Sequence, residues 1–247
     1  MFHLAVFGAY IDPGPGFKYV APRPDPMLRI EGNNIVIPEG LNYLVAFAAY
    51  SPNIAQARIE TPSLRRTVLL EIRPLCLNTF INDDKYVIKR LENPIVLEVS
   101  EPMRALAYHT YTGPQWIYIP VWLADGPISP VTEDYFTIRA VGTPTAGTKQ
   151  WENVTITFDQ TLPTGRYAMI GARCEGPSGL FRVCFVGQAW RPGGPTEDSH
   201  FSFNGISFRA GGWGVWGEFP HDQPPTFDIL TTEAGQPVFY LDLVKIA

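Results

Sequence analysis

The chain has 247 residues, of which 45% are hydrophobic and 13% aromatic, and this is enough apolar material to fill cores and to exclude a disordered chain. Charged residues make up only 17%, below the proportion of about a quarter that is usual in globular proteins. We therefore expect part of the surface to be covered by a neighbouring molecule; a β-rich protein with Ser, Thr, Asn and Gly on its surface is the alternative. The formal net charge of −5 argues against specific nucleic-acid binding, because binding to a phosphate backbone needs clusters of Lys and Arg.

The first thirty residues are rich in proline and glycine. The sequences DPGPGF and APRPDP favour an extended chain with few hydrogen bonds over a helix. Residues 1–30 are therefore predicted to form an extended arm that lies over the first domain or over a neighbour. The apolar run Leu4–Tyr10 is too short to span a bilayer and has no basic flank, so we expect neither a signal peptide nor a membrane anchor.

Two segments about half a chain apart carry similar patterns. Pro38–Tyr43 opens one apolar run, and Pro163–Tyr167 opens another. Further pairs follow in the same order: Ala48 with Ala172, Pro52 with Pro177, Arg58 with Arg182, Arg66 with Arg191, Leu97–Val99 with Phe227–Ile229, Gly113 with Gly235 and Tyr118 with Tyr240. A repeat of this length predicts two similar domains, which we place at residues 31–127 and 128–247, with the turn-rich GPISP as their junction.

Strand signals dominate both halves. Val154, Ile156 and Phe158 alternate with polar residues, and this pattern is typical of a strand with one face exposed to solvent. Trp116–Leu123 and Val238–Val244 are apolar on both faces, as strands buried between two layers are. Ser51–Arg58 is the one stretch that could be helical, and Asn204–Gly205 predicts a hairpin. Roughly a hundred residues per repeat can hold eight short strands, so the predicted fold is all-β, with two tandem jelly-roll β-sandwiches (a double jelly roll).

Residues suited to catalysis or metal binding do not gather in the sequence. The four histidines (His3, His109, His200 and His221) lack metal-ligand spacing. The paired carboxylates (Asp83–Asp84, Glu133–Asp134 and Glu197–Asp198) are neighbours in turn-like contexts and are interpreted as solvated loop charge. The three cysteines are interpreted as small buried hydrophobes. We therefore predict no enzyme, no catalytic residue, no cofactor and no metal; a hydrolase is the least favoured function.

Two segments are candidate contact regions. Arg58, Arg65, Arg66 and Arg73 gather between Gln56 and Pro74. They suit a local anion or nucleic-acid contact, or a solvated or inter-subunit loop that pairs with the acidic excess, and the charge balance favours the second. Trp213, Trp216 and Phe219 lie in a glycine-rich stretch that suits either a sugar-stacking platform or a core cap and subunit contact.

A duplicated, helix-poor and cysteine-poor chain with two jelly-roll-sized halves resembles the double jelly-roll major capsid proteins of tailless icosahedral viruses. The resemblance covers residues 31–247 and depends on architecture and on the paired segments above. It implies a structural protein that is made in the host cytoplasm and assembles in the virion as a pseudo-hexagonal homotrimer, beside other virion proteins and around an internal membrane. It implies no catalytic residue. Arg58–Arg73, the arm and Trp213–Phe219 are then the predicted contact regions. The alternative is a two-domain carbohydrate-binding module that uses Trp213 and Trp216.

Overall fold

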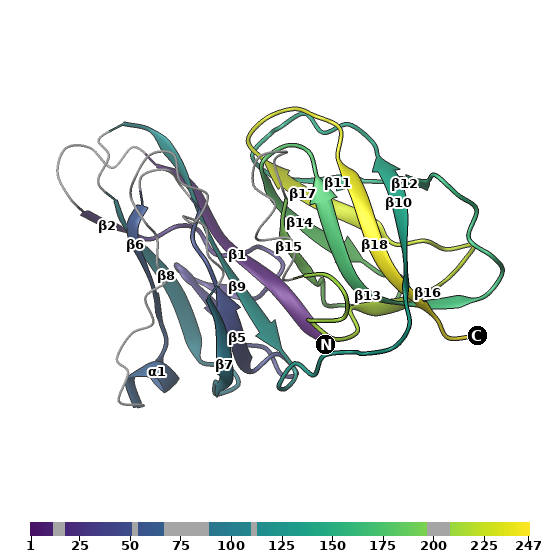
Figure 1. The fold of residues 1–247 in the computed structure, drawn as a ribbon. Helices are drawn as coiled ribbons and strands as arrows, with labels where there is room; N and C mark the ends of the chain where they lie inside the picture. The colour runs from purple at the N-terminus through teal and green to yellow at the C-terminus, as the bar shows by residue number, and fades with distance from the viewer. Residues whose placement is uncertain (12–17, 51–53, 67–88, 110–112, 197–207) are drawn as a thin grey trace. The chain divides into compact units, whose positions relative to one another are not determined.

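Strands account for nearly all the regular structure of this protein (Figure 1). The computed structural model describes residues 1–11, 18–50, 54–66, 89–109, 113–196 and 208–247. In these ranges the single helix is α1 (Pro62–Arg66), and all other elements are strands. The predicted all-β class is confirmed, and the sheets are β-sandwich-like. The chain divides into an N-terminal unit (Leu4–Pro127) and a C-terminal unit (Ile128–Ala247 together with Met1–His3).

The N-terminal unit is built from two sheets. The first has the order β1 (Phe2–Ile11), β9 (Gln115–Ala124), β5 (Tyr43–Phe47) and β7 (Lys89–Val96). The second has the order β2 (Lys18–Val20), β8 (Pro102–His109), β4 (Asn34–Val36) and β3 (Ile30–Glu31), with β6 (Ile54–Glu60) also paired to β8. Ile119 and Trp122 of β9 point to opposite faces, and both are 0% exposed, so the predicted burial of this strand on both faces is confirmed.

The C-terminal unit also has two sheets. The first has the order β12 (Ile156–Phe158), β10 (Phe136–Gly142), β18 (Val238–Lys245), β13 (Arg166–Glu175) and β16 (Gly217–Pro220). The second has the order β11 (Trp151–Val154), β17 (Thr226–Thr231), β14 (Gly179–Cys184) and β15 (Gly193–Pro195). Phe227 of β17 stacks on Phe239 of β18 with ring centroids 4.0 Å apart, so side chains from the two sheets meet in a shared core.

The first sheets of the two units share one strand order, apart from the edge strand β12. In each, the last strand (β9 or β18) pairs on one side with an early strand (β1 or β10) and on the other with a central one (β5 or β13). That central strand pairs in turn with β7 or β16. A β-bulge interrupts the same pairing in both units, between Leu44 and Ala46 and between Met169 and Gly171. In the second sheets, β8 pairs with β2 and β6 as β17 pairs with β11 and β14.

Some expectations at the level of single elements are wrong. Of the stretch Ser51–Arg58 that could be helical, residues 51–53 lie outside the described residues, and the rest pairs with β8 as part of strand β6 (Ile54–Glu60). Val154–Phe158 is not one strand, since β11 pairs with β17 and β12 pairs with β10 in the other sheet. The predicted hairpin at Asn204–Gly205 lies outside the described residues.

Two of the matched pairs in the repeat are also displaced. Leu97–Val99 follows β7 and lies outside any strand, whereas Phe227–Ile229 lies in β17. Tyr43 pairs with Ala124 and Tyr167 with Lys245, so residues of β9 and β18 correspond at an offset of 121, not at the 122 implied by Tyr118 and Tyr240. At these two places the matches in the sequence therefore do not follow the pairing of the strands.

The first thirty residues differ from the predicted arm. Phe2–Ile11 forms strand β1 at the edge of a sheet, and Phe2, Leu4 and Phe7 are almost fully buried. The free edge of β1 is covered by the chain near Asp25, whose Oδ2 accepts a hydrogen bond from the N–H of Val6 at 3.0 Å. The Gly8 N–H donates to the carbonyl of Arg23 at 2.8 Å. These described residues belong to the folded units.

Candidate interface

Arg58, one of the predicted contact residues, lies on the outer face of the sheet formed by β2, β8 and β6. Side chains alternate along a strand, so Ala57 and Ile59 point into the core while Gln56, Arg58 and Glu60 share the outer face. Across the paired strands, Tyr108 of β8 lies opposite both Tyr19 of β2 and Gln56 of β6. Arg104 of β8 lies opposite Glu60 of β6. We call this surface the Arg58 face; its members are Tyr19, Gln56, Arg58, Glu60, Arg104 and Tyr108.

Glu60 is the electrostatic centre of the Arg58 face. It is 7% exposed and accepts hydrogen bonds from Nε of Arg58 at 2.8 Å and Nε of Arg104 at 2.6 Å. Burial by itself would raise the pKa of Glu60, but the hydrogen bonds and charges of the two arginines outweigh burial and hold this pKa below its ordinary value. The carboxylate therefore stays ionised between the two guanidinium groups.

Aromatic rings complete the Arg58 face. The guanidinium carbon of Arg58 lies 4.9 Å from the ring centroid of Tyr19, a cation–π distance. The rings of Tyr19 and Tyr108 lie 5.1 Å apart, and the Tyr19 hydroxyl donates to Oε1 of Gln56 at 3.1 Å. Tyr19 is 44% exposed, and the side chain of Arg104 is 45% exposed. Tyr19, Tyr108 and Arg104 could not be predicted from the sequence, because only the strand register brings them beside Arg58.

Arg65 and Arg66 are the last two residues of α1, but their side chains lie outside the described part of the structure, as does the whole of Arg73. The helix itself is held by Glu101, whose Oε2 accepts hydrogen bonds from the N–H and the hydroxyl of Ser63 at 3.0 and 2.8 Å. Among the predicted arginines, only Arg58 therefore has a described interaction site.

The aromatic residues of the second predicted contact segment are buried. Trp213, Trp216 and Phe219 are 1%, 0% and 2% exposed. The ring of Phe2 lies 5.2 Å from that of Trp213 and 5.3 Å from that of Trp216, inside the C-terminal unit. The two indole rings are thus not available for sugar stacking, and none of the three is placed to contact a partner directly. Any contact made by this segment would use its exposed residues, Val215 and Glu218.

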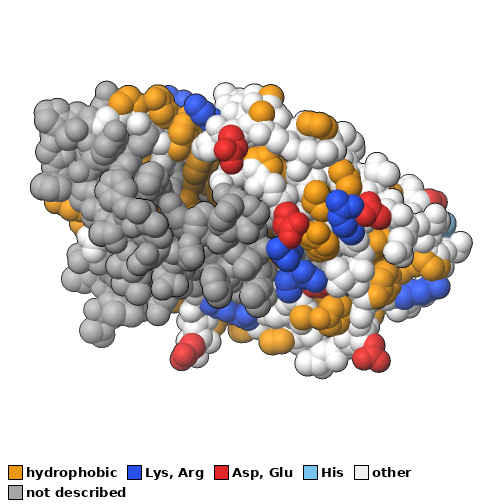
Figure 2. Space-filling view, turned by 45° about the horizontal axis from the view of Figure 1, so that its top comes forward, with side chains coloured by type: hydrophobic (Ala, Val, Ile, Leu, Met, Phe, Trp, Pro, Cys, Tyr) orange, Lys and Arg blue, Asp and Glu red, His pale blue; other side chains and the backbone are white. Residues whose placement is uncertain are grey.

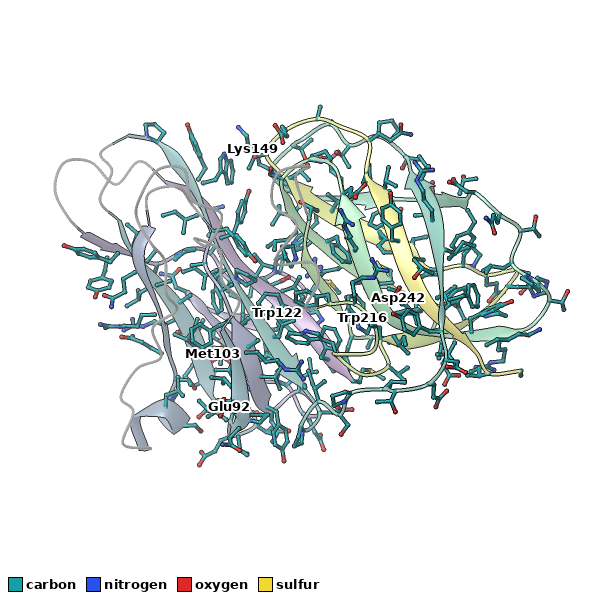
Figure 3. All side chains as sticks on the ribbon, in the orientation of Figure 1. Glu92, Met103, Trp122, Lys149, Trp216 and Asp242 are labelled. Carbon is teal, nitrogen blue, oxygen red and sulfur yellow. The ribbon has the colours of Figure 1, made fainter. Side chains whose placement is uncertain are left out.

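A buried carboxylate fixes the chain that leads into this segment. Asp242 is 0% exposed and accepts hydrogen bonds from Nε of Arg209 at 2.6 Å, from the N–H of Ala210 at 2.8 Å and from the hydroxyl of Thr137 at 2.7 Å (Figure 3). Ala210 has a φ of 53°, a left-handed conformation that costs a residue other than glycine about 1–2 kcal/mol. Its hydrogen bond to Asp242 helps to offset this cost. In the sequence, Asp242 stands out only as a carboxylate within an apolar strand. A carboxylate in such a strand is rarely buried without partners.

Replacing Asp242 with Asn should destabilise the protein at neutral pH. It should also make the free energy of unfolding depend less on pH in the acid range. Burial alone would raise the pKa of Asp242, but hydrogen bonds from Arg209, Ala210 and Thr137 lower it below the ordinary value of 3.8. The resulting stabilisation is present above the unfolded-state pKa and is lost as the pH falls through the lower folded-state pKa. We expect Asp242→Asn to cost about 2 kcal/mol at pH 7 and less at pH 3. Urea unfolding at both pH values measures this, and an equal cost at both would contradict it.

Buried residues of the C-terminal unit include an uncharged histidine. His3 is 0% exposed, and its Nδ1 accepts a hydrogen bond from the N–H of Arg191 at 3.0 Å. Burial, together with the charges of Arg182 and Arg191, lowers the pKa of His3 to about 3, so it stays neutral at physiological pH.

Of the cysteines interpreted as buried hydrophobes, Cys174 is buried and Cys184 half-buried, and burial raises the pKa of Cys184 to about 11. Cys76 lies outside the described residues.

Metal sites and membrane-spanning helices are both absent from the described part of the chain. No group of three His, Cys, Asp or Glu side chains is placed there to hold a metal ion. None of its helices has the length and apolarity needed to cross a membrane.

The sequence matches no known protein family, and no curated protein is detectably similar to it.

Proposed function

We propose that this chain is a self-assembling structural protein of a viral shell, built from two jelly-roll sandwiches. A jelly roll has eight strands that wind into two four-stranded sheets. Apart from the short edge strand β12, the C-terminal unit has one sheet in the order β10, β18, β13, β16 and another in the order β11, β17, β14, β15. Apart from β14 and β15, which are neighbours in one sheet, successive strands thus alternate between the two sheets, as in a jelly roll, and this order supports the proposal.

The observation that carries the proposal is the matching topology of the two units. The order β1, β9, β5, β7 corresponds strand for strand to β10, β18, β13, β16, and the bulge falls in the same pairing. If each chain contributes two similar units, a trimer has six such units around its axis. A trimer of this kind can occupy a hexagonal position in a closed lattice. A single binding module has no comparable need for this duplication.

The surface chemistry also favours broad contacts over a charged ligand. Three arginines at the surface are paired with carboxylates: the exposed Arg139 with Asp159, the exposed Arg166 with Glu218 and the half-buried Arg173 with Glu175. Figure 2 shows one face on which Lys and Arg side chains lie beside Asp and Glu side chains, among apolar ones. Surfaces with little uncompensated charge lose little free energy when a neighbour covers them. The carbohydrate-binding alternative lacks such support, because the indole rings on which it depends are buried.

The purified protein should form trimers or larger closed particles. Size-exclusion chromatography with light scattering would then give a mass of three chains or a multiple of it, and negative-stain electron microscopy would show hexagonal outlines or shells. A monomer at every protein concentration and salt concentration, with no particles in the micrographs, would overturn the proposal.

A further inference from the structure

The segment Met1–His3 is packed into the C-terminal unit through two aromatic side chains. The ring of Phe2 lies 5.2 Å from that of Trp213 and 5.3 Å from that of Trp216. Phe2 is 1% exposed and His3 is 0% exposed, so both rings are removed from water. We call Met1–His3 the docked segment.

One hydrogen bond fixes the protonation state in which His3 is docked. Its Nδ1 accepts a hydrogen bond from the backbone N–H of Arg191 at 3.0 Å. A ring nitrogen that accepts a hydrogen bond carries no proton, so the docked ring is neutral and has its one proton on Nε2. A second proton would have to bind Nδ1, and the new N–H would point at the N–H of Arg191. Protonation therefore breaks this hydrogen bond and places two donors against each other.

The groups around His3 also disfavour a positive charge on its ring. Burial is the largest effect, and the positive charges of Arg182 on β14 and of Arg191 act in the same direction. Asp228 of β17 is ion-paired with Arg191. Cys184 of β14 lies beside Asp228, and its raised pKa keeps the thiol uncharged.

The strand that pairs with β1 contributes little to the charge around the docked segment. β9 contains Tyr118 as its only titratable residue, and Tyr118 lies beside Gly8, further along β1. Asp125 follows β9 directly. Whatever the pairing of the charged groups, the hydrogen bond from the Arg191 amide by itself disfavours the protonated ring in the docked position.

We propose that mild acid shifts the docked segment toward a released state by protonating His3, and so uncovers Trp213 and Trp216. At neutral pH, the burial of Phe2 and the hydrogen bond to His3 hold the segment in place. A released His3 gains a proton at its ordinary pKa of 6.5, whereas the docked ring gains one only near pH 3. Docking is therefore strongest above pH 6.5 and weakens as the pH falls from 6.5 towards 3. This response goes beyond the proposed function and does not depend on it.

Hydrogen exchange at the Arg191 amide measures the release, because this N–H is bonded to His3 only in the docked state. The protection factor compares the observed exchange rate with the intrinsic rate at the same pH. In the wild type it should fall about thirtyfold between pH 7.5 and pH 5. Mass spectrometry on overlapping peptides that contain Arg191 gives this value. The amides of Leu241–Leu243, in an interior strand of the sheet, are the internal reference and should keep their protection.

His3→Asn is the matched variant for this experiment. The amide oxygen of asparagine can accept the hydrogen bond from Arg191, but the side chain does not titrate. Protection of the Arg191 amide should therefore be equal at both pH values in this variant. His221→Asn removes a histidine that follows β16 and should keep the wild-type response.

Two outcomes would overturn the inference. One is a His3→Asn variant in which the Arg191 amide responds to pH as in the wild type. The other needs only the wild type, so it applies even if His3→Asn does not fold: protection at Arg191 that is equal at both pH values, or that falls in step with the amides of Leu241–Leu243. Neither outcome involves assembly, so the proposed function would stand.

Discussion

Deleting Met1–Ile11 should abolish cooperative folding. These residues include β1, which pairs with β9, and Phe2, Leu4, Val6 and Phe7 are at most 4% exposed. Burial of each such side chain contributes about 1.5–3 kcal/mol, so their joint loss is comparable to the whole stability of a domain, about 5–15 kcal/mol. The deletion variant should be insoluble or should lack a sigmoidal unfolding transition by circular dichroism.

The matched control for this deletion is Tyr10→Ala. Tyr10 is 57% exposed at the far end of the same strand, and we expect its replacement to change the free energy of unfolding by no more than about 1 kcal/mol. A deletion variant that unfolds cooperatively within a few degrees of the full chain would contradict the conclusion that β1 is an integral strand of the fold. It would also restore the prediction from sequence that the first residues form an extended arm.

Replacing Trp216 with Ala should lower the free energy of unfolding by about 3–5 kcal/mol. Trp216 is 0% exposed, and its ring lies 5.3 Å from that of Phe2, 6.2 Å from Phe208 and 6.3 Å from Phe181, so truncation leaves a large cavity. We expect the melting temperature to fall by roughly 10 °C or more. Differential scanning calorimetry measures both quantities.

Two variants make the Trp216 result specific. Val215→Ala, at the neighbouring position that is 42% exposed, should change stability by about 0.5 kcal/mol at most. Trp216→Phe should cost less than Trp216→Ala, because it keeps most of the ring volume and removes a buried indole N–H that has no hydrogen-bond partner among the described residues. If Trp216→Ala were as mild as Val215→Ala, the ring would not be part of the core, and a ligand-binding role for it would be open again.

Local patterns predicted the strands well where the hydrophobic signal was strong. Trp116–Leu123 and Val238–Val244 are apolar on both faces and lie within β9 and β18, each in the interior of its sheet. The pattern failed at Thr155, where the chain leaves one sheet and enters the other. Alternation of apolar residues tells which face is buried, but it contains no information on which sheet a strand joins.

The candidate interface was harder to predict, because its members are far apart in the sequence. Tyr19, Arg58 and Tyr108 meet only through the register of three strands, and no spacing along the chain indicates this. The interpretation of Trp216 also depended on a distant residue, since Phe2 from the opposite end of the chain packs against it. The alternatives left open for this aromatic stretch could be decided only by such long-range packing.

The covered edge of β1 limits how copies of this protein can join. Strands with free backbone groups invite addition of further strands, which leads to open-ended fibres. In this protein the carboxylate of Asp25 and the carbonyl of Arg23 already accept hydrogen bonds from the Val6 and Gly8 amides. Growth by strand addition at this position is therefore blocked, so an assembly of the kind we propose would have to join its copies elsewhere on the surface.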